Sequence, residues 1–152
     1  MMKREELQEK LLQINSTITF EEGGENLNLQ IEAKDIKDFM QMLLNDNALH
    51  FDYLFSLTCV DWKTHLSMVY HLESTNLQHA IVVKTKLDTG NPEVETVSDL
   101  WATAEFHERE VFDLFGVRFI NHPDLRRLLL TEDWNGYPLR KDYEDPINMI
   151  KL

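Results

Sequence analysis

Apolar residues recur at helical and then at strand spacing in the first part of the chain. Over residues 3–14 they fall at every third or fourth position, at Leu7, Leu11 and Ile14, which predicts a short amphipathic helix. Apolar and polar residues then alternate at 18–20 and at 27–31, on either side of the Glu-Glu-Gly-Gly turn at 21–24. This alternation predicts a hairpin of two strands with one face toward water.

A second helix and three more strands are expected before residue 88. Asp35 can cap a helix whose apolar stripe spans residues 36–44, and the Asn-Asp-Asn run at 45–47 ends it. Three runs of strand character follow, at 51–62, 65–73 and 79–87. The first run is apolar on both faces, which predicts a strand in the middle of the sheet.

The last third of the chain combines one more helix with a broken apolar segment. Ser98 can cap a third helix that runs to Phe115, where Gly116 stops it. After Gly116, leucine and aromatic residues are repeatedly interrupted by Asn, Gly and Pro. Such a segment cannot form a core of its own, so it must lie against its own domain or a partner. We therefore expect a domain over 1–116 and an extended tail over 117–152.

The order of these elements defines the expected fold class. The order α-β-β-α-β-β-β-α predicts an α+β fold, a two-layer domain in which helices pack on one face of a mixed sheet, followed by the extended tail. The length of 152 residues is that of one domain and suffices for a core without disulfides or metals.

Charge and composition exclude several function classes. A formal net charge of −12 disfavours binding to nucleic acids and to anionic membrane surfaces. No stretch approaches the about 20 apolar residues of a membrane span, and the N-terminus lacks an apolar signal core, so we expect a cytoplasmic protein. The single cysteine, Cys59, cannot hold an iron–sulfur cluster alone and is expected to be a buried thiol.

The third helix carries the charged residues that are hardest to explain. At about 100° per residue, Glu108 falls within the apolar stripe of this helix. A carboxylate there must be paired, so we expect a buried ion pair between Glu108 and one of three arginines that follow, Arg118, Arg126 or Arg127. Glu105, Arg109 and Asp113 line the opposite side at intervals of four, which is typical of weak pairs on a solvated face.

A catalytic or metal-binding role for the same region is the main competing interpretation. A stand-alone enzyme could use Glu108, Glu110 and Asp113 around His107 or His122. However, neither the Glu-x-x-His spacing of di-iron sites nor the His-Glu-x-x-His zinc pattern is present. The chain also lacks a glycine-rich phosphate loop and a nucleophile elbow.

The residues from 108 onward resemble the signature of the C subunit of respiratory complex I, the 30 kDa subunit family of NADH–quinone oxidoreductase. The positions that match are Glu108, Arg109, Glu110, Asp113, Leu114, Phe115, His122, Arg126, Leu128 and Leu129. The continuation is also similar to that family, at Trp134, Arg140, Lys141, Asp142 and Tyr143. The first 100 residues add a compatible order of elements and no motif.

The resemblance implies a structural role in a larger enzyme. Subunits of this family lie in the hydrophilic arm, on the cytoplasmic side of the bacterial inner membrane, and contribute to proton-translocating electron transfer from NADH to quinone. The resemblance implies no cofactor in this chain; NADH, FMN, iron–sulfur clusters and quinone would be bound by other subunits. The D subunit would be the main partner, with the B and I subunits nearby, and the signature residues would form the interface. An equivalent subunit of a membrane-bound energy-converting hydrogenase is the nearest alternative.

Overall fold

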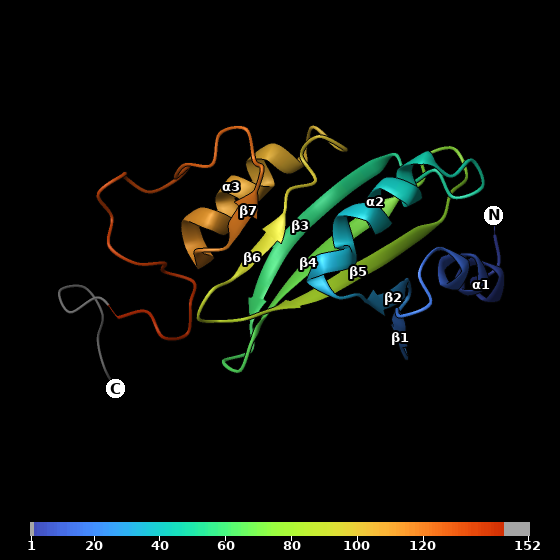
Figure 1. Ribbon diagram of the computed structural model, residues 1–152, viewed down its shortest axis with the longest axis horizontal. Helices are drawn as coiled ribbons and strands as arrows, with labels where there is room; N and C mark the ends of the chain where they lie inside the picture. Colours follow the sequence, from blue (N-terminus) through green and yellow to red (C-terminus); the bar gives the residue numbers. More distant parts are fainter. Residues whose placement is uncertain (1, 145–152) are drawn as a thin grey trace.

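A five-stranded mixed sheet organises the computed structural model, which describes residues 2–144 (Figure 1). The elements in chain order are α1 (Arg4–Ile14), β1 (Thr19–Glu21), β2 (Leu27–Gln30), the 3₁₀ turn η1 (Ala33–Asp35), α2 (Ile36–Asn45), β3 (Tyr53–Asp61), β4 (Leu66–Glu73), β5 (Ala80–Leu87), β6 (Glu93–Glu95), α3 (Ala104–Phe115) and β7 (Arg118–Ile120). The strand order in the sheet is β1-β2-β5-β4-β3. Only the β2–β5 pair is parallel within it, so the predicted α+β fold with a mixed sheet is confirmed.

One face of the sheet carries the core. Alternate residues of β3, β4 and β5 point to this face, where they pack with the buried stripes of the three helices. In α2 that stripe consists of Ile36, Phe39, Met40 and Leu43, each at most 2% exposed. Figure 1 shows α2 lying across the sheet and α3 beside β3. The helices on one face therefore supply the second layer that the sequence predicted.

Strand β3 lies at the edge of the sheet, so the prediction of a central strand is wrong. Its outward residues are exposed in spite of being apolar, for example Tyr53 and Phe55. An apolar run on both faces was taken as a sign of burial between two neighbouring strands. Here the second apolar face stays open, and only the face toward α3 is buried.

Helix α3 begins at Ala104, later than the predicted start at Ser98. The residues before it form turns whose side chains bond to the start of β3. The Trp101 indole N–H donates to the Phe51 carbonyl oxygen at 3.0 Å, and the Thr103 hydroxyl donates to the Leu54 carbonyl oxygen at 3.0 Å. These bonds hold the segment along the strand and delay the helix. The predicted cap of α2 also differs, because the Asp35 side chain makes no capping bond.

The end of α3 turns the chain into strand β7 and then into the tail. Gly116 adopts the left-handed conformation with φ of 77°, as predicted for the residue that stops the helix. Strand β7 pairs in parallel with β6 in a separate two-stranded sheet. Val117 and Phe119 belong to the core, at 0% and 2% exposure. The packed domain thus includes residues just beyond 116.

Gly116 also provides a first test of how the tail packs. A Cβ built on Gly116 would lie 2.7 Å from two ring carbons of Tyr137 in the tail. We expect Gly116→Ala to lower the free energy of unfolding by about 2 kcal/mol or more, because the left-handed strain adds to the steric clash. Gly23→Ala is the control, since Gly23 has φ of 83° and nothing within 4 Å of a Cβ. Equal losses in urea denaturation would contradict the packing of Tyr137 on Gly116.

Candidate partner-docking site

The carboxylate of Asp113 anchors the tail to helix α3. Asp113 is fully buried, and its Oδ2 accepts hydrogen bonds from three successive backbone N–H groups, those of Leu128, Leu129 and Leu130, at 3.3, 2.6 and 3.0 Å. Burial opposes ionisation, but the N–H groups of Leu130 and Leu129 together with Arg127 hold the pKa of Asp113 below its ordinary value. Asp113 is therefore a charged anchor inside the protein.

Arg127 ties the same anchor to the following turn of the tail. Its Nη1 donates to the carbonyl oxygen and to Oδ1 of Asp113 at 2.9 and 3.1 Å, and its Nη2 donates to the carbonyl oxygens of Trp134 and Gly136, both at 3.0 Å. The guanidinium carbon lies 5.0 Å from the centroid of the Tyr137 ring. The guanidinium fork thus joins helix α3 to two successive turns of the tail.

Arg109 adds a second set of bonds from the helix to the tail. Its Nε and Nη2 donate to the carbonyl oxygens of Arg126 and Arg127 at 3.2 and 3.1 Å. Arg109 is 5% exposed and Asp113 is fully buried, so the prediction of a solvated ladder on this side of α3 is wrong. The tail covers that side of α3. The helical periodicity of the sequence could not show what lies over a charged face.

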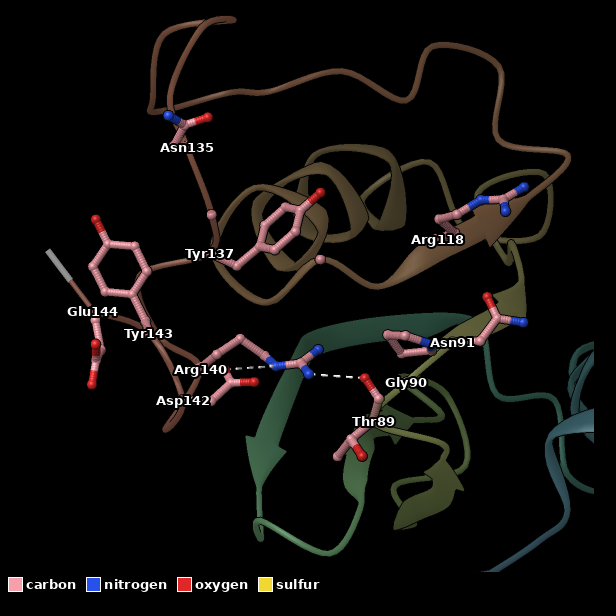
Figure 2. A pocket seen from close by; sticks show the side chains of 13 residues that line it. Thr89, Gly90, Asn91, Arg118, Asn135, Tyr137, Arg140, Asp142, Tyr143 and Glu144 are labelled. Atoms are coloured by element: carbon pink, nitrogen blue, oxygen red, sulfur yellow. Dashed lines mark hydrogen bonds and ion pairs between the residues drawn. The ribbon is translucent and has the colours of Figure 1, made fainter.

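The end of the tail is fixed to the domain at a separate point. The Arg140 guanidinium donates to the carbonyl oxygens of Phe115 and Thr89 at 3.2 and 2.8 Å, and it lies 3.6 Å from Asp142. Figure 2 shows the contacts of Arg140 with Thr89 and Asp142, beside an open groove between the tail and the loop at 89–92. The groove has a volume of about 630 Å³. Asp61, at the end of β3, accepts a hydrogen bond from the Lys141 N–H at 2.8 Å.

Polar contacts hold the tail, while many of its apolar side chains remain outside. Leu129, Leu139, Leu128 and Trp134 are 63%, 53%, 38% and 37% exposed. On α3, Phe106 is also exposed, at 58%, and its ring centroid lies 5.8 Å from the guanidinium carbon of Arg109. We call these five residues the tail surface. Large apolar side chains that stay exposed on an ordered segment are typical of a protein–protein interface.

Glu108 is buried as predicted, but no arginine pairs with it. Its Oε2 accepts the Val97 N–H at 2.9 Å and its Oε1 accepts the Thr96 hydroxyl. Among the three candidates, Arg127 binds Asp113, while Arg118 and Arg126 lie exposed beside Glu93 and Asp124. The predicted ion pair between Glu108 and an arginine is therefore wrong. The hydroxyl of Thr96 and the backbone N–H of Val97 bind this carboxylate instead. Burial raises the pKa of Glu108 to about 7.

His122 is the residue of the tail that comes nearest to Glu108. Its Nε2 lies 3.8 Å from Oε1 of Glu108, and both side chains are fully buried. The Asp124 N–H donates to Nδ1 at 3.0 Å, so Nε2 carries the ring proton and lies 3.1 Å from the Glu105 carbonyl oxygen. This geometry gives His122 a structural role at the start of the tail.

The remaining signature residues divide between the fold and the surface. Leu114 accepts a backbone hydrogen bond from Leu139 at 3.0 Å, and Phe115 packs against the core. Exposed side chains are those of Glu110, Arg126, Lys141 and Asp142. Tyr143 lies beside Gly136. Most of the signature residues thus lie on α3 and the tail. Glu108 bonds to the segment at 96–97, whereas Asp113 bonds to the tail.

Sequence reasoning missed two residues that bind the signature segments. Thr96 and Asp61 were not singled out, although each binds a signature segment. Asp61 at the end of a strand resembles an ordinary turn residue, and its Oδ1 does accept the Lys63 N–H at 2.8 Å. Within residues 2–144, no three His, Cys, Asp or Glu side chains are grouped so that they could hold a metal ion.

The buried anchor predicts that the tail depends on the charge of Asp113. Asp113→Asn leaves Arg127 without its carboxylate, and we expect a loss of about 3 kcal/mol in the free energy of unfolding, because one partner of a buried pair is removed. Asp124→Asn is the matched control, since Asp124 and Arg126 form an exposed pair in the same segment and little change is expected. Equal effects in urea denaturation would contradict the anchor.

The raised pKa of Glu108 predicts a dependence of stability on pH. Because the folded-state pKa is about 7 and the ordinary value is 4.5, the stability linked to this group is complete below pH 4.5 and is lost as the pH rises through 7. Glu108→Gln should therefore be more stable than the parent at pH 8, by about 3 kcal/mol at most, and lose that advantage by pH 4.5. Thermal melts at a series of pH values would show this, and parallel curves would contradict it.

Two solved structures resemble this fold. A chain of the membrane-bound sulfane sulfur reductase, an archaeal respiratory membrane complex, superposes with a TM-score of 0.80 and 30% identity over 94% of this chain and 86% of that one. The trypsin-resistant fragment (1-134) of Nqo5 superposes with a TM-score of 0.69 and 28% identity, over 82% of this chain and all of the fragment.

Relatives known by sequence are named as subunits of one enzyme. A protein of Phocaeicola vulgatus, named as the C/D subunit of NADH-quinone oxidoreductase, is 48% identical over 126 residues, which cover 82% of this chain and 24% of that protein. The C subunit of the same enzyme in Roseiflexus sp. is 40% identical over 120 residues, which cover 77% of this chain and 69% of that protein. This chain therefore spans about a quarter of the C/D protein.

The family match agrees with the signature and extends beyond it. Residues 29–146 match the family described as the respiratory-chain NADH dehydrogenase, 30 Kd subunit. The match includes the sheet from β2 onward, α3 and the tail residues that bind Asp113 and Arg109. The chain belongs to the family of the 30 Kd subunit of the respiratory-chain NADH dehydrogenase.

Proposed function

We propose that this chain is a non-redox structural subunit in the hydrophilic arm of a proton-translocating NADH–quinone oxidoreductase and that its tail surface docks on the D subunit. The single observation that carries the proposal is the tail itself. Asp113, Arg127 and Arg109 hold its backbone in place, yet Leu129 and Leu139 remain more than half exposed. The tail is thus ordered by polar bonds and presents apolar groups outward, as a docking segment requires.

The relatives support the D subunit as the partner. In Phocaeicola vulgatus and Bacteroides thetaiotaomicron, the similar proteins are named as C/D subunits. A single chain keeps its two parts at high effective concentration, which favours an interface between them.

The wider assignment follows from membership of such an assembly. Electron transfer from NADH to quinone would take place on other subunits, with NADH, FMN, iron–sulfur clusters and quinone bound there, and the B and I subunits would lie near this chain. No helix within residues 2–144 is long and apolar enough to cross a membrane. Attachment to the cytoplasmic side of the membrane would then depend on the other subunits.

A second candidate function is the equivalent subunit of a respiratory membrane complex other than NADH–quinone oxidoreductase. The chain from the sulfane sulfur reductase favours it, because the superposition covers 94% of this chain and 86% of that one. An energy-converting hydrogenase would be another such complex. Purification of the complex through this chain, followed by an assay of NADH oxidation and identification of the co-purified proteins, would separate the two candidates.

Docking through the tail can be tested with matched substitutions. In native membranes, tagged chain should co-purify with the D subunit, and Leu129→Asp should weaken that association by about tenfold or more, because a carboxylate would replace an apolar group in a desolvated contact. Leu12→Asp is the control, since Leu12 is also an exposed leucine, at 41%, on α1 at the other end of the domain. Unchanged recovery of the D subunit with Leu129→Asp would remove the proposed docking surface.

A further inference from the structure

The sheet has a second face that no helix covers within the described residues. On this face, β4 and β5 present Ser67, Val69, His71 and Val82, which lie outside the core cluster. Val69 and Val82 are nevertheless only 9% and 5% exposed. The open face thus has a floor of small and apolar groups.

Strand β3 lines one side of this face with large apolar residues. A bulge between Leu54 and Ser56 leaves Phe55 unpaired, so that Tyr53 and Phe55 both point outward. Their rings lie 5.9 Å apart, and the Phe55 ring lies 5.5 Å from that of His71. The exposed fractions are 43% for Tyr53, 39% for Phe55, 36% for Val60 and 57% for Trp62 just after the strand. We call these four residues the β3 column.

Strand β5, in the middle of the sheet, carries two lysines on this face. The register places Val60, Ser67 and Lys86 in one row across the three strands. In the next row, Lys84 lies beyond Val69 and binds Glu21 at 2.8 Å. Lys86 is exposed and has no ion-pair partner among the described residues. The two columns are separated by two strand spacings, about 10 Å, which is close to the diameter of an α-helix.

We propose that the open face between the β3 column and Lys86 is a second docking surface, which takes an amphipathic helix from another subunit of the assembly. The apolar side of that helix would pack on the β3 column, and an Asp or Glu at its edge would pair with Lys86. Charge complementarity favours an acidic group of the partner at Lys86, whereas a second copy of this chain, at a net charge of −12, would be repelled.

The β3 column and the tail surface consist of different residues, although the tail touches the end of β3 where the Lys141 N–H donates to Asp61. The tail surface lies on the tail and on the outer side of α3, whereas the β3 column belongs to the sheet face that turns away from the helices. The proposal requires an assembly with at least one further subunit, but it does not require that the tail binds the D subunit.

A photo-crosslinker can identify the occupant in the assembled complex. Trp62→p-benzoylphenylalanine, irradiated in native membranes, should crosslink to a helical segment of another subunit with apolar residues at spacings of three and four and a neighbouring Asp or Glu. The same crosslinker in place of Met42, which is 50% exposed on α2, is the control and should not reach that segment. A crosslink at Trp62 to a second copy, to residues 145–152 of the same chain or to no protein would overturn the proposal.

Charge reversal then tests the predicted pairing. Lys86→Glu should lower the crosslink yield at position 62 at least threefold, and a lysine in place of the acidic residue in the crosslinked segment should restore it. An unchanged melting temperature would show that Lys86→Glu leaves the fold intact, and an unchanged yield would contradict the pairing. A crosslinker at Leu129 reports separately on the D subunit, so failure of one surface leaves the result for the other standing.

Discussion

The contact between the Asp113 carboxylate and the tail determines how the two parts of this protein relate. A buried carboxylate costs several kcal/mol unless charged and dipolar groups surround it. Asp113 meets this requirement with Arg127 and with three consecutive backbone N–H groups, all supplied by residues 127–130. The tail therefore depends on the helix for its position, since this one carboxylate holds both its backbone N–H groups and Arg127.

The sequence was a good guide to the sheet and a poor guide to what covers each charge. Periodicity correctly indicated the hairpin, α2, the runs that became β3, β4 and β5, and the stop at Gly116. Periodicity could not distinguish an edge strand with an apolar open face from a central strand, because both have apolar residues on both faces. The placement of β3 depends on pairing partners, which a single strand does not reveal.

In the candidate site, too, the sequence did not reveal which groups contact each buried charge. The helical periodicity correctly placed Glu108 on the buried side of α3. The nearest arginines in sequence were not its partners, however. Backbone N–H groups can satisfy a carboxylate as well as a guanidinium can, and no residue type marks them in a sequence. Arg109 and Asp113 looked like surface residues because the tail that buries them has no regular structure of its own. The family signature located these residues without indicating which contacts they make.

The Asp113 anchor also explains why the leucines beside it are not hidden. When three adjacent amides converge on one oxygen atom, the backbone curves around that oxygen as a concave nest, and the side chains radiate from its convex side. The curvature leaves Leu128 and Leu129 projecting from the convex surface. Outward-pointing apolar groups are thus a geometric by-product of the way the carboxylate is solvated by peptide dipoles. A protein that secures a segment in this manner exposes apolar side chains at the same position.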